Sequence, residues 1–268
     1  MNRATLFHRD PREVPFIHDQ VRKLITLADA TSRNVKIRED DDLSFMAIQF
    51  LYKQIQHAES ILTLVPRRDA GLIARTMIDG LYQLLWTCQA PSERARLWRS
   101  FAAIRDWRLI QGRLREGLPV DQADMCATDA RIKEFGHLHR LRKLKTNSLD
   151  PYYRTWHGGV TLADMADAVG RELYDGPYAE LSDWEHWGVS GIGESIVREI
   201  DHATVNSNSD RVTGQALLAA FQCLLQTLEV ADLQLSLNII NPIQSLSKGF
   251  RETLDSFYAI QPQESNEA

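Results

Sequence analysis

Apolar residues recur at three- and four-residue intervals along almost the whole chain, which is the spacing of amphipathic α-helices. Pro15 suits the first turn of a helix that is predicted to run to about Thr31. The acidic run 39–42 caps a second helix through Val65, because carboxylates complement the positive end of the helix dipole. Further helices are predicted over residues 69–89, 91–116, 121–141, 161–170, 177–187 and 212–238, and a last one ends at Tyr258.

No run of alternating apolar and polar residues bounded by turn signals predicts a β-sheet. The longest apolar helix, residues 212–238, is expected at the centre of the fold. Repeats of solenoid length and low-complexity linkers are both absent from the sequence. We therefore predict one all-α domain over residues 1–260, a single helical bundle of about seven to nine helices. The polar tail 261–268 is predicted to be disordered.

The composition of the 268 residues, 44% hydrophobic and 25% charged, is that of an ordinary globular protein. A net charge of −5 gives no global attraction to nucleic acid or anionic membranes. The three cysteines, Cys88, Cys126 and Cys223, lie far apart, which suits a reducing compartment and disfavours a disulfide framework or a zinc ribbon. No apolar run approaches the ~20 residues of a membrane span. We expect a cytoplasmic protein without membrane association, metal or other cofactor.

A polar stripe lies opposite the apolar face of the helix predicted over residues 69–89. Its members follow one another at four-, three- and four-residue spacing on a helical wheel: Arg75, Asp79, Tyr82 and Trp86. A tryptophan on the far side of a helix predicts that this side also meets another element. Arg75 and Asp79 could then form an oriented pair that leaves part of the guanidinium free for an anion. The alternative is an exposed ion pair with little effect on stability.

The segment from Tyr152 to Gly188 is dense in aromatic and ionisable side chains. In the helix predicted there, Tyr178, Ser182 and His186 project to one side, and Ser182 and His186 are one turn apart. A serine hydrolase is disfavoured, because a mid-helix serine has no free backbone amides for an oxyanion hole and the GxSxG motif is absent. Nucleotide-binding loops of the GxxxxGK[ST] and GxGxxG kinds are absent as well.

We expect the two polar strips to converge in one partly buried cluster. The cluster comprises Arg75, Asp79, Tyr178, Ser182 and His186. Burying these groups separately would leave charges unpaired, at a cost of several kcal/mol. Together, Asp79 holds Arg75 while Ser182 and His186 complete the hydrogen bonds. Such a cluster would bind a small anion or a partner protein.

Two segments resemble a family of uncharacterised bacterial proteins, domain-of-unknown-function family 5677. The first, LIARTMIDGLYQLLW over residues 72–86, looks like that family's helix with an arginine followed by an acidic residue and an aromatic. The second, residues 156–186, is similar to its pattern of Trp, Leu-Tyr, Tyr, Leu-Ser and His. The resemblance covers roughly residues 45–240 and implies a fold and a site without an activity. It implies these motif positions: Arg75, Asp79 (in place of the more usual glutamate), Tyr178, Ser182 and His186.

The alternative function is metal-independent RNA cleavage, by resemblance to the HEPN superfamily of helical bundles, which use an arginine and a histidine. Arg131 and His137 match the Rx4–6H spacing of that superfamily, and Arg75 with His186 could supply the same chemistry from two helices. The histidine would act as acid and base, and the arginine would stabilise developing negative charge. A basic run at residues 139–145 is either a solvated helix end that complements the helix dipole or a contact for an anionic partner. We favour non-enzymatic binding, because the chain is acidic. Self-association into a homo-oligomer is left open.

Overall fold

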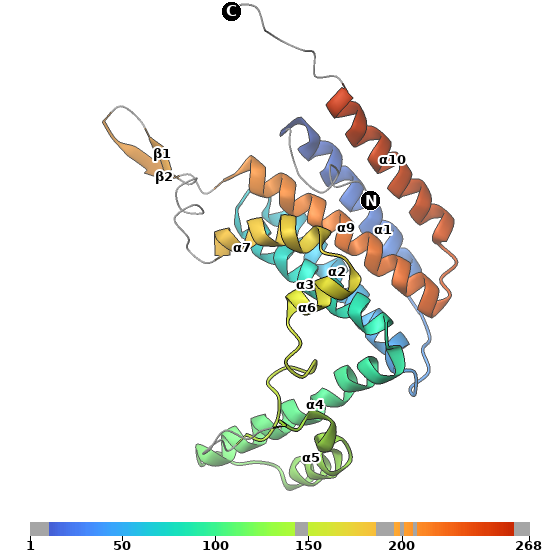
Figure 1. The fold of residues 1–268 in the computed structure, drawn as a ribbon, viewed down its shortest axis with the longest axis vertical. Coiled ribbons are helices and arrows are strands. Elements are labelled where there is room, and N and C mark those ends of the chain that lie inside the picture. The colour runs from blue at the N-terminus through green and yellow to red at the C-terminus, as the bar shows by residue number, and fades with distance from the viewer. Residues whose placement is uncertain (1–10, 143–149, 186–195, 199–200, 206–207, 260–268) are drawn as a thin grey trace, which may run out of the picture.

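The computed structural model describes residues 11–142, 150–185, 196–198, 201–205 and 208–259, and it confirms an all-α bundle (Figure 1). Nine α-helices lie in the described residues. They are α1 (Val14–Ser32), α2 (Asp42–Leu64), α3 (Asp69–Cys88), α4 (Pro91–Arg115), α5 (Gln122–Phe135), α6 (Leu162–Val169), α7 (Ala179–Glu185), α9 (Asp210–Leu235) and α10 (Ile240–Ala259). Short helical turns add η2 (Pro11–Glu13), η3 (Gly136–His139) and η4 (Tyr174–Tyr178).

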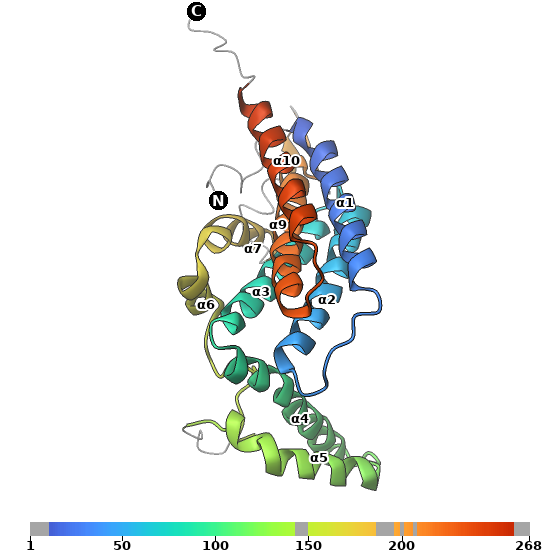
Figure 2. The same ribbon diagram turned by 90° about the vertical axis from the view of Figure 1, so that its right-hand side faces the viewer.

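The helix α9 forms the centre of the bundle, as its apolar sequence predicts. It packs against α1, α2 and α3, and α10 lies beside it in both ribbon views (Figures 1 and 2). Phe221 of α9 is fully buried and stacks on Phe250 of α10, with ring centroids 3.9 Å apart. By length and composition α9 could also cross a membrane, but the core helix of a bundle passes the same test, and most of α9 is buried here.

Helix-capping residues lie at the helix ends that the sequence predicts. Asp41 accepts a hydrogen bond from the Ser44 backbone amide at 3.0 Å, which begins α2. Thr161 forms a capping box with Asp164 at the start of α6. Gly170 ends α6 with φ of 120°, a backbone conformation that residues with a Cβ rarely adopt. These ends explain why most helix boundaries were predicted to within a few residues.

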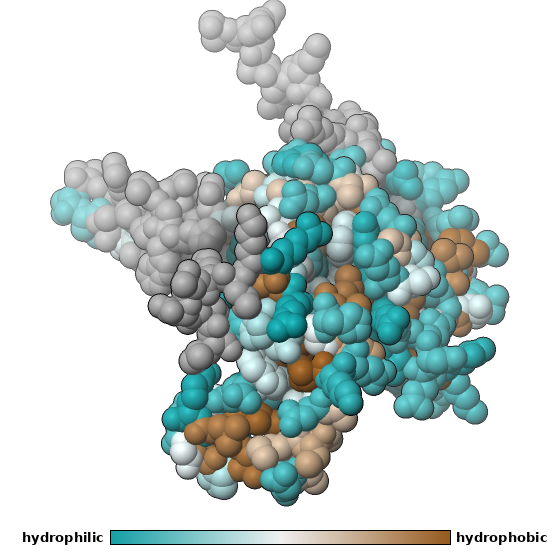
Figure 3. Space-filling view, turned by 60° about the horizontal axis from the view of Figure 1, so that its bottom comes forward, coloured by the Kyte–Doolittle hydropathy of each residue, from teal (hydrophilic) through white to brown (hydrophobic). Residues whose placement is uncertain are grey.

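The helices α4 and α5 pack on each other and project below the other helices (Figures 1 and 2). Apolar side chains are visible among polar ones on this end of the molecule (Figure 3). The exposed large apolar residues here are Leu109, Leu114 and Leu118. The outer part of α4 therefore lies outside the main core, and its inner part supplies residues to the site described below.

One predicted helix boundary and one missed hairpin distinguish the prediction from the structure. The helix expected to reach residue 141 ends at Phe135 and continues as η3, where Gly136 approaches Tyr152 closely enough that a Cβ would lie 3.1 Å from its hydroxyl. The strands β1 (Ile196–Arg198) and β2 (Ala203–Val205) form an antiparallel hairpin that was not predicted. Three residues per strand are too few for an alternating pattern to be recognised.

Replacing Phe221 with alanine should lower the free energy of unfolding by about 3–5 kcal/mol, because the change leaves a cavity beside Phe250 in the core. Urea unfolding followed by circular dichroism measures the change. Leu233→Ala is the matched control on the same helix, since Leu233 is 78% exposed and its loss should change stability by less than about 0.5 kcal/mol. Equal effects of the two changes would contradict a central position of α9.

Candidate functional site

Arg75 of α3 meets Tyr178 at the end of η4, which joins the two polar strips at this point. The Arg75 Nη2 atom donates a hydrogen bond to the Tyr178 hydroxyl at 3.0 Å, and the guanidinium carbon lies 4.9 Å from the centre of the Tyr178 ring. Ser182 donates its hydroxyl hydrogen to the backbone carbonyl of Tyr178 at 2.6 Å. The Ser182 hydroxyl is thus engaged with the backbone of its own helical segment.

Asp79 lies on a different side of the site from Arg75. It accepts a hydrogen bond from Gln83 Nε2 at 3.4 Å and lines a hollow that also includes His57 of α2. Residues one turn apart on a helix can pair. Here the Arg75 guanidinium instead contacts Tyr178, and the described contact of Asp79 is with Gln83. His186, the remaining member of the expected cluster, lies outside the described residues.

The far side of α3 meets the segment that follows residue 150, as the position of Trp86 predicts. The Tyr82 hydroxyl donates to the Gly170 carbonyl at 2.9 Å and accepts from the Tyr174 amide at 3.0 Å. Burial raises the pKa of Tyr82 to about 12, so the hydroxyl stays protonated. The Trp86 ring lies 5.7 Å from the ring of Trp156. Both aromatic residues of the stripe thus pack against another part of the chain.

The segment 150–157 is fixed to both α4 and α3. Arg108 of α4 binds the Asp150 carboxylate at 2.7 Å and donates to the carbonyl of Tyr153 at 2.7 Å. The Trp156 indole donates to Gln83 Oε1 of α3 at 2.9 Å. These contacts place the side chains of residues 154–157 beside the inner part of α4.

A hollow of 600 Å³ opens where this segment, α4 and α5 come together, and we call it the arginine groove. Its volume is within the range of about 300–1,000 Å³ that is usual for ligand pockets. Among the residues that the structure describes, four arginines, four aromatic residues and no carboxylate line it. The lining residues that matter below are Trp98, Arg99, Arg105, Arg131, Arg154, Trp156 and His157.

The charge of the arginine groove is only partly neutralised by acidic residues around it. Arg131 pairs with Asp106 at 2.6 Å, and Arg99 pairs with Asp42 at 2.9 Å. Arg105 is exposed and has no ion-pair partner among the described residues. Arg154 is exposed at the opposite wall. The groove therefore carries excess positive charge although the whole chain is acidic.

His157 is the titratable group of the arginine groove that can exist in neutral form near pH 7. Burial lowers its pKa below the usual range, against the opposing effects of a Val160 backbone contact and the Asp79 charge. Its Nδ1 atom lies 3.4 Å from the Thr155 hydroxyl. Within the described part of the chain, no group of three or more His, Cys, Asp or Glu side chains is arranged to hold a metal ion.

Arg131 and His137, the pair with the HEPN-like spacing, do not line the same hollow. Arg131 lines the arginine groove, whereas His137 is exposed on η3 and does not line it. His139, counted above in a basic run, is 1% exposed and shares a hydrogen bond of 2.9 Å with the Ser100 hydroxyl. Burial, with a smaller effect of the His137 charge, lowers the pKa of His139 to about 4. His139 is therefore neutral at pH 7 and adds no charge.

Sequence reasoning did not single out Arg105, Arg154, Trp98 or the role of His157. One signal was present, because α4 contains seven arginines in 25 residues and has little amphipathic order. A helix with so many cations and few partners of its own is expected to face acidic groups elsewhere or a ligand.

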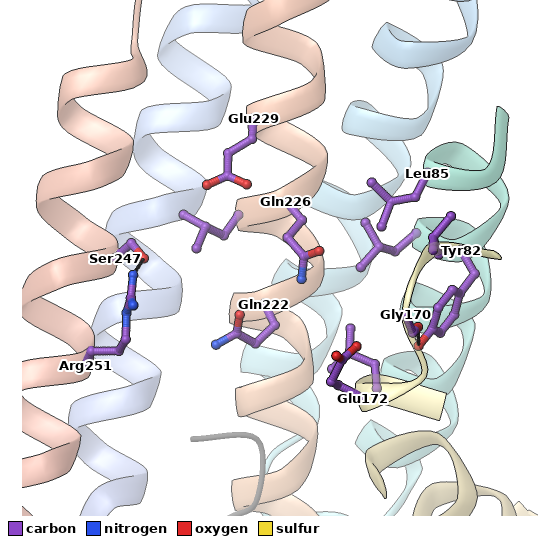
Figure 4. A pocket seen from close by; sticks show the side chains of 13 residues that line it. Tyr82, Leu85, Gly170, Glu172, Gln222, Gln226, Glu229, Ser247 and Arg251 are labelled. Atoms are coloured by element: carbon purple, nitrogen blue, oxygen red, sulfur yellow. Dashed lines mark hydrogen bonds between the residues drawn. The ribbon is translucent and has the colours of Figure 1, made fainter. Parts of the chain in front are cut away.

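A separate cavity of 350 Å³ lies between α3, α9 and α10 (Figure 4). Gln222 and Glu229 project from α9 toward the side of Arg251 on α10, and Tyr82 and Gly170 form the opposite side (Figure 4). Burial raises the pKa of Glu229, and the Arg251 charge opposes this effect. Two carboxylates, Glu172 and Glu229, face this cavity with a single arginine, so it is a poorer site for an anion than the arginine groove.

Comparison with known proteins gives a family and no activity. A family model described as "Family of unknown function (DUF5677)" matches residues 44–203, more than half of the chain. No curated protein and no solved structure matches the chain. The matched range contains all the residues that line the arginine groove.

The buried neutral state of His139 should make stability depend on pH. Its pKa of about 4 in the folded protein lies below the unfolded value of about 6.5, so protonation favours unfolding and stability falls as the pH drops from about 6.5 to about 4. Between pH 7 and pH 5 the wild type should lose about 1–2 kcal/mol more than a His139→Gln variant, measured by urea unfolding at each pH. His137→Gln, at an exposed position, should keep most of the wild-type slope, because its charge affects the pKa of His139 less than burial does. An unchanged slope in His139→Gln would contradict this assignment.

Proposed function

The chain belongs to DUF5677, a family of unknown function, and we propose from its own geometry that it binds an anionic ligand, with phosphate or a similar oxyanion group, in the arginine groove. The observation that carries the proposal is the lining of this groove, in which the described residues include four arginines and four aromatic residues and no carboxylate. A surface with that composition attracts anions and disfavours cations.

The chemistry of these side chains fits a phosphate group. A guanidinium offers paired N–H donors that match two oxygens of a phosphate, and such charge-assisted bonds are about twice as strong as neutral ones. Arg105 and Arg154 are the two exposed guanidiniums of the groove, so their donors face solvent at its walls. Arg131 and Arg99 are partly compensated by Asp106 and Asp42 and are better suited to shaping the groove.

This proposal keeps the class of ligand expected from the sequence and moves its location. Arg75 was expected to bind the anion, yet its guanidinium stacks on Tyr178 and donates to the Tyr178 hydroxyl. None of the hollows described above is lined by Arg75, Tyr178 or Ser182. These three residues are better explained as the contact that holds η4 and α7 against α3.

RNA cleavage is the second candidate, and the position of His157 favours it. A neutral histidine beside arginines supplies the acid and base and the charge stabilisation that metal-independent cleavage of RNA needs. His157, rather than the expected His137, lies in the groove with Arg131. In this candidate the catalytic pair is therefore Arg131 with His157 instead of Arg131 with His137, and the reaction is still RNA cleavage.

Loss of Arg105 or Arg154 should weaken binding of pyrophosphate roughly tenfold each, because a hydrogen bond to a charged group contributes about 1.5–3 kcal/mol before solvent screening. Isothermal titration calorimetry of Arg105→Ala and Arg154→Ala at low salt measures the effect. Arg113→Ala is the matched control, since Arg113 is exposed on α4 and does not line the groove. Equal losses in all three variants, or no binding by the wild type, would contradict the proposal.

We expect no cleavage when purified protein is incubated with labelled single-stranded RNA, because anion binding alone is the main proposal. Cleavage that disappears in His157→Ala and persists in His137→Ala would establish the second candidate instead. Cleavage that disappears in His137→Ala would support the pair inferred from sequence spacing. Both histidines are exposed or half-buried, so their replacement should leave the fold intact.

A further inference from the structure

A second hollow of 460 Å³ adjoins the arginine groove, and we call it the Asp79 hollow. It lies between α2, α3 and α4, with Asp79 and His57 among its lining residues. Gln83, Trp98 and Arg105 line both hollows. The Asp79 charge also influences the pKa of His157 in the arginine groove. The two hollows therefore adjoin and share part of their walls, and together we call them the depression.

The Asp79 hollow differs from the arginine groove because it adds a carboxylate and uncharged hydrogen-bond acceptors to the cations Lys53 and Arg105 that also line it. Asp79 accepts one long hydrogen bond, from Gln83 at 3.4 Å, which leaves most of the acceptor capacity of its carboxylate unused. Gln54 is 3% exposed and donates to the Met77 carbonyl at 2.9 Å, yet its buried Oε1 atom has no protein partner. Buried amide oxygens are normally paired, and this one has no partner among the described residues while its side chain belongs to the lining of the hollow, so it is a candidate acceptor for a ligand donor.

His57 adds a third polar group to this hollow. Its Nε2 atom is buried and has no hydrogen-bond partner in the described part of the chain. Burial, together with the Lys53 charge, lowers the pKa of His57, so this nitrogen can either accept or donate a hydrogen bond near pH 7. A ligand here would meet a carboxylate oxygen, an amide oxygen and an imidazole nitrogen. Hydroxyl and amino groups are the ligand groups that satisfy this set.

An aromatic wall connects the two chemistries. Trp98 is half-buried, lines both hollows and is held edge-on by Phe50 at a centroid distance of 5.8 Å. An indole at this position offers a flat surface on which a heteroaromatic ring can stack. The depression thus presents cations at one end, an aromatic wall in the middle and hydrogen-bond acceptors at the other end.

We infer that the ligand of the arginine groove is a mononucleotide, with its phosphate among Arg105 and Arg154 and its base and ribose hydroxyls in the Asp79 hollow. This inference rests on the proposed function and adds the class of ligand. A nucleotide carries an anionic group, a flat ring and several hydroxyl or amino donors in one molecule, which is the order of chemistry along the depression. Recognition would use side chains of α2, α3 and α4 together with Arg154 of the segment 150–157, without a glycine-rich loop.

The test compares AMP and UMP with ribose 5-phosphate and inorganic phosphate by isothermal titration calorimetry on the full chain. The nucleotides should bind at least tenfold more tightly than inorganic phosphate. Asp79→Asn should abolish most of this advantage without lowering affinity for inorganic phosphate. Asp69→Asn is the matched control for the lost negative charge, because Asp69 is exposed at the start of the same helix and lines neither hollow.

Each alternative result of this titration would contradict a different part of the proposal. Nucleotides that bind no more tightly than inorganic phosphate would overturn this inference and leave anion binding intact. Ribose 5-phosphate that binds as tightly as AMP would overturn the role of the base. A nucleotide advantage that survives Asp79→Asn would overturn the placement in the Asp79 hollow. Absence of binding by every probe, including pyrophosphate, would overturn the proposed function itself.

Discussion

The site depends on the guanidinium of Arg108, which ties the segment after residue 150 to α4. This half-buried group binds the Asp150 carboxylate and two backbone carbonyls, those of Tyr152 and Tyr153. Burial raises the pKa of Asp150, but hydrogen bonds from Arg108 and the Tyr152 amide and nearby positive charge outweigh burial, so the carboxylate stays ionised. Arg108 therefore fixes the start of this segment against α4, while the Trp156 indole, which binds Gln83, fixes its end against α3.

An acidic protein can carry a local cationic groove, because the charge of a groove depends on which residues line it and not on the net charge of the chain. The net charge of −5 reflects carboxylates that lie mostly on other surfaces, several of them in exposed ion pairs. Such pairs contribute little to stability and cancel locally. Over distances beyond about 10 Å, salt screens the remaining charges, so a ligand in the groove responds mainly to the nearest arginines. Total charge alone is therefore a weak guide to the ligand.

The fold was largely predictable from the sequence, whereas the site was only partly so. Helical spacing, the Thr161 capping box and Gly170 are local signals, and the structure follows them. The stripe on α3 correctly indicated a second contact surface, because Trp86 and Tyr82 need partners. The direction taken by Asp79 was not predictable, since it depends on which helix lies beside each turn of α3. Arg105 and Arg154 line the same groove only because of tertiary packing, so no sequence spacing could predict that they belong to one site.

The helix α3 shows how one spaced pair of charges can serve two purposes. Arg75 and Asp79 are one turn apart, and an isolated helix would pair them. In the bundle, the Arg75 guanidinium binds the Tyr178 hydroxyl at the end of η4. Asp79 instead lines a hollow whose other walls come from α2 and α4. Separating the pair leaves a half-buried carboxylate in the hollow that Arg105 of another helix also lines. A carboxylate so placed repels a phosphate but accepts hydrogen bonds from hydroxyl groups, so in the proposed ligand it favours an uncharged polar part over the phosphate.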